Sequence, residues 1–341
     1  MSKLPESQEF LAARPPTVPL SEVSRVVEDH FELRGHYTPL VSERDQNFRL
    51  AAYDGNDYVV KVSNPNEAAM VTGFQVDLLL HLQECCDVPT PVVKRTIAGD
   101  CSASFEFAGE IYSMRVVSYL DGTPLGTLAL TEEIAADFGG KLARLDHALE
   151  SFPATGENPF SLWDLQQAAA LRDLQQHIDD PGIRSVVAGT LDQFEAFVAP
   201  RLRKLPRQAI HGDANPENVI ADAAGKRVYG FIDFGDAVFA PRVVDVAIAA
   251  SYLRAGEPQP LRLINAFIGA YHSVQQLNPE EQELLLDLVR TRLATTITLL
   301  YWRLSAREDN DPYRQKTLQS EGDAIHFLRA LELSDEGQVQ T

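Results

Sequence analysis

The chain has 341 residues, 45% of them hydrophobic and 23% charged, which is ample material for a packed core in one large or two modest domains. Its 30 Lys and Arg are outnumbered by 49 Asp and Glu, and the formal net charge of -19 repels the phosphates of nucleic acids and of anionic membranes. This balance argues against a nucleic-acid or membrane partner, and it suits a cationic or zwitterionic small molecule.

The cysteines and the N-terminal residues indicate the cellular compartment. There are three cysteines, an odd number without metal-ligand spacing, which fits a reducing compartment. Residues 1–20 have neither the basic segment nor the apolar core of a secretory signal, and we predict that they form a flexible N-terminus. No stretch approaches the roughly 20 apolar residues that span a bilayer. We therefore expect a cytoplasmic protein.

The first part of the chain alternates apolar and polar residues between turn signals. Residues 48–53 and 58–62 are predicted as the two strands of a hairpin, with Asp54-Gly55-Asn56-Asp57 as its turn. From Val71 to Leu82 the apolar spacing changes to a helical period. Two more strands are predicted near residues 105–107 and 111–119. The pattern indicates a small antiparallel sheet with one helix.

From residue 120 onward helical patterns dominate. Helices are predicted over residues 131–149, 162–177, 183–197 and 279–307, the last with Asn278 as N-cap and Pro279 at its first position. A short strand-like stretch, residues 209–233, interrupts them. The fold class is therefore α+β with two lobes, a β-rich N-lobe over 21–119 and a larger, mainly helical C-lobe over 120–341.

Two segments of the strand-like stretch carry the residues of phosphoryl transfer. They are Ile210-His211-Gly212-Asp213-Ala214-Asn215-Pro216-Glu217-Asn218 and Gly230-Phe231-Ile232-Asp233-Phe234-Gly235-Asp236. The reaction needs a carboxylate that deprotonates the acceptor hydroxyl and oxygen ligands that hold Mg²⁺ on the phosphates. We predict Asp213 as catalytic base, with Asn218 and Asp233 as metal ligands. Either segment alone could be a capped turn or an ordinary loop, and it is their combination that carries the prediction.

The two segments resemble those of the aminoglycoside phosphotransferase and choline kinase superfamily, relatives of the protein kinases. His211-Gly212-Asp213 with Asn218 matches the catalytic loop of that superfamily, and Ile232 to Asp236 matches its metal-binding segment. The resemblance covers the chain roughly from Val26 to the C-terminal helices. It implies a bilobal protein-kinase-like fold, a nucleotide-binding N-lobe, and a C-lobe that carries catalysis and acceptor binding. It also implies Mg²⁺ as cofactor and ATP or GTP as co-substrate.

In such a fold a lysine on an N-lobe strand holds the nucleotide phosphates. Lys61, in Tyr58-Val59-Val60-Lys61-Val62, fits this role, and the alternative is a lysine whose ammonium reaches solvent at a strand edge. An acidic residue of the following helix usually orients this lysine. Glu67, Gln75 and Asp77 remain open as candidates.

The turn that would cover the phosphates, residues 41–48, contains no glycine. Ser42 and Asn47 could offer donors there, although an ordinary polar turn fits the same residues. By family resemblance alone, the connector near Val117 and Tyr119 is expected to bind the purine through backbone hydrogen bonds.

The acceptor is expected to be small. After Gly235 the chain reaches Pro241-Arg242 and a helical run over 243–252 almost at once, which leaves no room for the long activation segment on which protein kinases dock peptides. Asp245 in that run is expected either to brace the catalytic loop or to face solvent.

Within the superfamily the chain is most similar to the hydroxylysine kinase group, which phosphorylates the side-chain hydroxyl of 5-hydroxylysine, with GTP as donor in some members. This similarity rests on Asp45-Gln46-Asn47-Phe48, Tyr58-Val59-Val60-Lys61-Val62-Ser63-Asn64 and the Gly230 to Asp236 segment. The similarity implies that the acceptor is an amino alcohol or an amino acid. Asp236 or Glu217 could contact its ammonium group. Kinases for homoserine, choline, ethanolamine or an aminoglycoside, a compact bacterial Ser/Thr protein kinase and a nucleotide-binding pseudokinase remain alternatives. The oligomeric state is left open.

Overall fold

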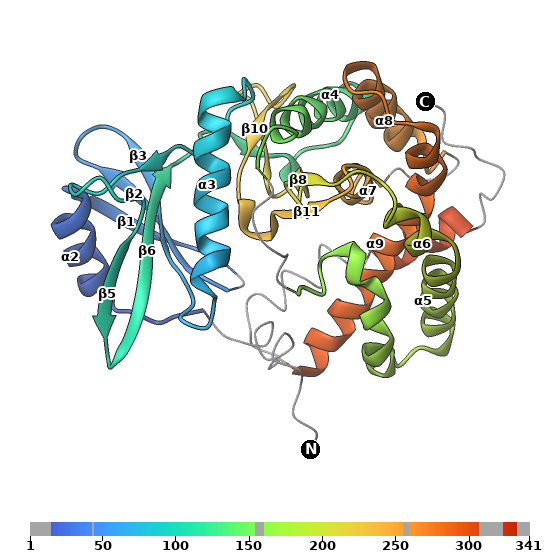
Figure 1. Ribbon diagram of the computed structural model, residues 1–341, viewed down its shortest axis with the longest axis horizontal. Helices are drawn as coiled ribbons and strands as arrows, with labels where there is room; N and C mark the ends of the chain where they lie inside the picture. The colour runs from blue at the N-terminus through green and yellow to red at the C-terminus, as the bar shows by residue number, and fades with distance from the viewer. Residues whose placement is uncertain (1–14, 43, 154–159, 255–258, 307–322, 333–341) are drawn as a thin grey trace. The chain divides into compact units, whose positions relative to one another are not determined.

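The computed structural model describes residues 15–42, 44–153, 160–254, 259–306 and 323–332 (Figure 1). The chain divides into two compact units. The N-terminal unit comprises Met1–Glu84 with Thr90–Asp121, and the C-terminal unit comprises Cys85–Pro89 with Gly122–Thr341. Most of the predicted flexible N-terminus, residues 1–14, lies outside the described residues, and a helix begins at Leu20.

The N-terminal unit is built on one antiparallel sheet of six strands. The strand order is β1-β2-β3-β6-β4, with β5 paired to β6, and the bounds are β1 Gly35–Leu40, β2 Gln46–Ala52, β3 Asp57–Val62, β4 Val93–Lys94, β5 Ala103–Phe107 and β6 Glu110–Ser118. The predicted hairpin is β2 and β3, and the carboxylate of Asp54 in its turn accepts the N–H of Asn56 at 2.8 Å. The predicted helix is α3, Ala69–Cys85.

A second helix, α2 (Leu20–Phe31), is missing from the sequence predictions and covers one face of this sheet. Alternate residues of the strands share a core with it, namely Phe48 and Leu50 of β2, Val60 and Val62 of β3, and Met114 and Val116 of β6. Because side chains alternate across a strand, Lys61 and Arg115 lie on the opposite face. Arg115 donates to Gln75 of α3 at 2.7 Å, so α3 packs on the face that carries Lys61.

Helices make up most of the C-terminal unit. Their bounds are α4 Glu132–Leu149, α5 Pro181–Gln193, α6 Ala199–Leu202, α7 Val243–Ala250, α8 Arg262–Val274 and α9 Pro279–Ala306. The predicted helix over 162–177 is a 3-10 helix, η2, over Leu165–His177. Asn278 caps α9 as predicted, because its Oδ1 accepts the N–H of Glu281 at 2.9 Å while Glu281 Oε2 accepts the N–H of Asn278 at 2.7 Å.

Two small antiparallel sheets interrupt the helices where the sequence predicts strands. One has the order β10-β9-β7 and the other pairs β11 with β8, with bounds β7 Thr123–Pro124, β8 Gln208–Ile210, β9 Val219–Ala221, β10 Val228–Phe231 and β11 Val238–Ala240. β8 ends just before His211, β9 begins just after Asn218, and β10 ends two residues before Asp233. The predicted catalytic and metal-binding residues therefore lie at strand ends.

The segment after Asp233 is as short as predicted. It forms the 3-10 turn η4 (Phe234–Asp236) and strand β11, and α7 then begins at Val243. Val238 of β11 is paired with Ile210 of β8, so this segment returns directly to the strand that precedes the catalytic loop. In the described part of the chain, no helix is both long and apolar enough to cross a membrane.

Candidate active site

The predicted catalytic loop begins with a glycine that no other residue can replace without strain. Gly212 has a φ of +77°, and a Cβ built on it would lie 2.1 Å from the carbonyl oxygen of Asp236. Asp245 of α7, which is fully buried, accepts the N–H of His211 and of Gly212, each at 2.9 Å. The predicted brace is thus confirmed, and the solvent-facing alternative for Asp245 is wrong.

His211 joins the catalytic loop to the predicted metal-binding segment. Its Nδ1 accepts the N–H of Asp213 at 3.2 Å, so its Nε2 carries the proton and donates to the carbonyl of Ile232 at 3.0 Å. Its ring packs on that of Phe234 with 4.5 Å between centroids. The N–H of Ile232 in turn donates to the carbonyl of Asn218 at 2.9 Å. The two predicted segments are therefore connected through side chain and backbone.

Three side chains hold the carboxylate of Asp213. Its Oδ2 accepts from the side-chain amides of Asn215 at 2.8 Å and Asn218 at 3.0 Å. Its Oδ1 accepts from the guanidinium of Arg292 at 2.9 Å. The side chain of Asp213 is 21% exposed and that of Arg292 is 2% exposed. The carboxylate is thus oriented inside the protein while part of it still reaches solvent.

The surroundings of Asp213 bring its titration close to neutral pH. Burial raises the pKa of its carboxyl to about 7, Arg292 opposes this, and the nearby charges of Asp236 and Asp233 add to it. A group that takes up a proton near neutral pH suits general base catalysis.

Asn218 and Asp233 present the donor chemistry of a magnesium site. The Nδ2 of Asn218 donates to Asp213, so its amide oxygen is directed elsewhere. Asp233 has left-handed backbone dihedrals, φ 59° and ψ 78°, a conformation that for a non-glycine residue often marks a functional position. Amide and carboxylate oxygens are ligands that Mg²⁺ prefers, and Mg²⁺ is often bound by one or two protein groups with substrate phosphates completing the shell. The described residues contain no group of three or more His, Cys, Asp or Glu side chains that could hold a metal ion.

A second buried carboxyl group lies close to Asp245. Asp146 of α4 is fully buried, and its Oδ2 accepts from the hydroxyl of Tyr271 at 2.7 Å. Burial first and the charge of Asp245 second raise the pKa of Asp146 well above its usual range. Because Asp245 already accepts two backbone N–H groups, Asp245 is the ionised member of the pair and Asp146 carries the proton.

This pair predicts how stability depends on pH. Since the folded state raises the pKa of Asp146, the stabilisation is fully present below the unfolded-state pKa of about 4 and is lost as the pH rises through the folded-state pKa. In D146N an amide can still donate to Asp245 and accept from Tyr271, but it does not titrate. Relative to the unmodified protein, the free energy of unfolding of D146N should therefore gain up to about 1.4 kcal/mol per pH unit above about pH 4.

Denaturant unfolding at a series of pH values checks this, and a difference that stays constant with pH would contradict it. Y271F is the companion variant. The Tyr271 hydrogen bond lowers the pKa of Asp146, so its removal should extend the loss of stability to higher pH.

In the N-terminal unit, three of the predicted nucleotide-binding residues share one face of the sheet. Lys61 lies opposite Asn47 of β2, and Val117 of β6 lies opposite Val59, two residues before Lys61 on β3. All are on the face away from α2. The side-chain oxygen of Asn47 is buried without a hydrogen-bond donor among the described residues.

Of the three candidates for the partner of Lys61, Glu67 has the best support. Gln75 accepts from Arg115 at 2.7 Å, and Asp77 is exposed. Burial and the charge of Asp45 raise the pKa of Glu67, whereas Lys61 is among the cations that lower it, so the two side chains are within electrostatic reach.

Ser42 and Tyr119 make local contacts of their own. Ser42 Oγ accepts the N–H of Asp45 at 3.3 Å, as in an ordinary polar turn. The N–H of Tyr119 donates to the carbonyl of Asp57 at 2.9 Å, and its ring lies 4.2 Å from the guanidinium of Arg49. Tyr119 also lines a hollow of about 620 Å³ in this unit, together with Ser118, Asp121 and Lys94 among others. A purine in this region would have to use groups other than the N–H of Tyr119.

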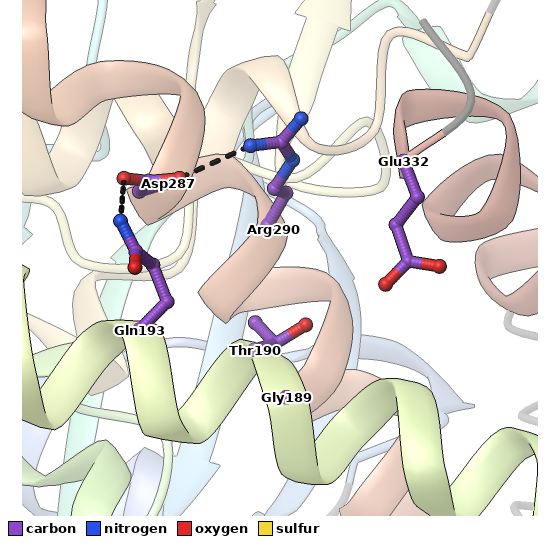
Figure 2. A pocket seen from close by; sticks show the side chains of 6 residues that line it. All are labelled: Gly189, Thr190, Gln193, Asp287, Arg290 and Glu332. Atoms are coloured by element: carbon purple, nitrogen blue, oxygen red, sulfur yellow. Dashed lines mark hydrogen bonds and ion pairs between the residues drawn. The ribbon is translucent and has the colours of Figure 1, made fainter. Parts of the chain in front are cut away.

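The C-terminal unit has a hollow of about 440 Å³ that contains none of the predicted site residues (Figure 2). Gln193 of α5 donates to Asp287 of α9 at 3.1 Å, and Asp287 accepts from Arg290 at 3.1 Å. Arg290 also donates to the carbonyl of Leu331 at 3.0 Å. These contacts attach one side of α9 to its neighbours.

Two of the residues that donate hydrogen bonds to Asp213 were not predicted from the sequence. Asn215 lies inside the motif itself, and its position two residues after Asp213 was a usable signal. Arg292 is 79 residues away from Asp213 in the chain, on a helix whose pattern predicts only packing, so no local signal pointed to it.

The site consists of Asp213 on the loop that contains Gly212, Asn218 hydrogen-bonded to it, and Asp233 just after a β-hairpin. The chain that carries it has one unit built on an antiparallel sheet and one helical unit. This combination defines the class of kinase-like phosphotransferases. The model of the phosphotransferase enzyme family matches residues 36–284, and the chain belongs to this family.

Relatives and solved structures agree with this membership. The chain is 26% identical over 332 residues to hydroxylysine kinase of Danio rerio, covering 93% of each chain. It is 31% identical over 231 residues to homoserine kinase of Methylobacillus flagellatus, covering 67% of each. An amicoumacin kinase in complex with AMP-PNP, Ca²⁺ and Ami matches with a TM-score of 0.67 at 15% identity, over 95% of each chain.

A microcompartment-associated aminopropanol kinase matches with a TM-score of 0.64 at 15% identity, over 94% of this chain and 99% of that one. These structural matches confirm the predicted kinase-like fold. The family and its kinase relatives identify a small-molecule kinase that acts on a hydroxyl group.

Proposed function

We propose that the protein transfers the γ-phosphoryl group of ATP or GTP to the side-chain hydroxyl of 5-hydroxylysine. The observation that carries this proposal is the similarity to hydroxylysine kinase across 93% of both chains, which includes both predicted segments. Homoserine is the second candidate acceptor, because the homoserine kinase relative has the higher identity, 31%, over a shorter length.

At phosphorus the proposed step makes one bond and breaks one, and a proton is transferred with it. The hydroxyl oxygen of the acceptor attacks the γ-phosphorus, the bond from that phosphorus to the β,γ-bridging oxygen breaks, and the nucleoside diphosphate leaves. The hydroxyl proton passes to the carboxylate of Asp213, which Asn215, Asn218 and Arg292 hold in place. These contacts support Asp213 as the base because they orient its carboxylate before the acceptor arrives.

The remaining site residues are assigned around this step. Asn218 and Asp233 would hold Mg²⁺, which when bound neutralises charge on the phosphates. Lys61 would bind the phosphates, with Ser42 and Asn47 near them and Val117 and Tyr119 near the purine. Residues 21–119 would thus form the nucleotide-binding lobe, and residues 120–341 would carry catalysis and acceptor binding.

The charge of the protein supports an acceptor that carries an ammonium group. The formal net charge is -19, and the carboxylate of Asp236 is close enough to raise the pKa of Asp213. Both favour a cation beside the acceptor hydroxyl. Asp236 and Glu217 are the carboxylates proposed to meet it.

A coupled assay of nucleoside-diphosphate release tests this proposal. With Mg²⁺ and ATP or GTP, we expect 5-hydroxylysine to give the highest kcat/KM in a panel that includes homoserine, ethanolamine, choline and kanamycin. Highest turnover with another member would reassign the acceptor. Phosphate transfer to lysate proteins alone would favour a protein kinase. No turnover with any member of the panel, with nucleotide still bound, would favour a pseudokinase.

A further inference from the structure

Arg292 is a buried cation on the long helix α9, and its side chain is 2% exposed. Its guanidinium meets three groups from three different segments. Nη2 donates to Oδ1 of Asp213 at 2.9 Å and to the hydroxyl of Tyr252 at 3.3 Å, and Nη1 donates to the carbonyl of Trp163 at 3.2 Å. The guanidinium carbon also lies 4.6 Å from the centroid of the Trp163 ring.

Helix α9 is fixed on a side other than the one that carries Arg292. Figure 2 shows Asp287 of α9 facing Gln193 of α5, with dashed lines from the carboxylate of Asp287 to Gln193 and to Arg290. Arg290 and Arg292 are two residues apart, which places their side chains about 200° apart around the helix axis. The neighbours of α9 thus hold the helix while Arg292 extends from another side to Asp213.

The contact of Arg292 matters because of where it falls on the carboxylate. The amides of Asn215 and Asn218 both reach Oδ2 of Asp213, and Arg292 reaches Oδ1. A turn of the carboxylate plane about the Cβ–Cγ bond moves both oxygens, and amides on Oδ2 alone resist it from one side only. A third donor on Oδ1 fixes that plane, and with it the direction of the remaining lone pair of Oδ1.

We infer that Arg292 is a positioning residue for the phosphoryl transfer, which fixes the carboxylate of Asp213 so that a lone pair of Oδ1 faces the acceptor hydroxyl. This inference rests on the proposed role of Asp213 as base. Arginine suits the task because a planar guanidinium can meet Asp213, Trp163 and Tyr252 at once, whereas a lysine ammonium is a point charge without that fork. Nothing in the sequence motif of the catalytic loop encodes this contact.

The test compares R292A, R292K and D213N with the unmodified protein, using the acceptor that gives turnover in the panel above. Slow hydrolysis of the nucleotide, with water as acceptor, gives the same comparison without any acceptor. We expect R292A to lower kcat about 10²-fold, the loss typical of a misplaced catalytic group, with the acceptor KM and the nucleotide Kd unchanged. We expect R292K to lose a comparable factor, because its charge is kept but its geometry is not.

Two further measurements separate positioning from mere stability. A sub-denaturing concentration of ethylguanidinium should restore turnover to R292A by filling the vacated space, and it should not restore turnover to R292K or to D213N. In the D213N background, adding R292A should cost no further turnover, because the group that Arg292 positions is already inert. R290A is the control on the same helix, and it should lower thermal stability while kcat stays near that of the unmodified protein.

The outcomes distinguish the two proposals. If D213N is inactive while R292A and R292K keep the full kcat, the positioning role is wrong and the proposed function stands. If D213N itself is active, Asp213 is not the base, and the premise of this inference fails while the proposed transfer to the acceptor stands. Should R292A not fold, R292K decides, because full turnover with a lysine there would overturn the inference.

Discussion

Replacing Asp213 with Asn should lower kcat by about 10²- to 10⁴-fold while nucleotide binding is kept. The amide has nearly the shape of the carboxylate but cannot accept the proton of the acceptor hydroxyl. Asp213 is held by Asn215, Asn218 and Arg292 and is not assigned to the metal, so the phosphates lose no ligand. Single-turnover kinetics together with calorimetric titration of the nucleotide separate the two effects.

The control for this variant is D222N, an equivalent change in the same unit. Asp222 lies between β9 and β10, and its carboxylate accepts the N–H of Lys226 at 2.9 Å. It stabilises a turn and has no part in the proposed site, so D222N should turn over normally. A D213N protein that is folded and fully active would show that another group serves as base.

Replacing Asp233 with Asn should act on the metal instead. The variant is expected to lose about 10²- to 10³-fold in kcat, the scale for removing one charge-stabilising group, and to bind nucleotide with a much weaker dependence on Mg²⁺. Asparagine retains an oxygen ligand but not the negative charge. It also tolerates the left-handed backbone at this position, φ 59°, so the turn itself should survive the change.

Nucleotide affinity measured across a series of Mg²⁺ concentrations checks this second prediction. In the unmodified protein affinity should rise steeply with Mg²⁺, and in D233N the curve should flatten. An unchanged curve with unchanged kcat would remove Asp233 from the metal site. A uniform loss of affinity at every Mg²⁺ concentration would point to a distorted nucleotide site instead.

Local patterns in the sequence were sufficient for much of the fold. The hairpin of β2 and β3 follows from alternation around a turn-rich tetrad, and the start of α9 follows from Asn278 and Pro279. Helix α2 was missed although Val23, Val26, Val27 and Phe31 have helical spacing, so the signal was present.

Contacts between distant segments were beyond local patterns. The motif put Asp213 and Asn218 in one loop, and in the structure the amide of Asn218 donates to the carboxylate of Asp213. The third partner of Asp213, Arg292, depends on how α9 packs within the helical unit, which spacing in the sequence does not specify. The acid partner of Lys61 was left open for the same reason, because Gln75 is engaged by Arg115 from a different strand. The roles assigned to Lys61, Ser42, Asn47, Val117 and Tyr119 remain predictions.

The brace between Asp245 and the catalytic loop has a consequence for motion. Loops usually open at little cost because their amide hydrogens face water. Here the amides of His211 and Gly212 are bound to a fully buried carboxylate of a core helix, so their hydrogens can exchange with solvent only when that part of the core opens. We therefore expect these two amides, which directly precede Asp213 in the chain, to exchange slowly. The backbone that leads into Asp213 is thus tied to α7, and we expect it to move less than a loop whose amides face water.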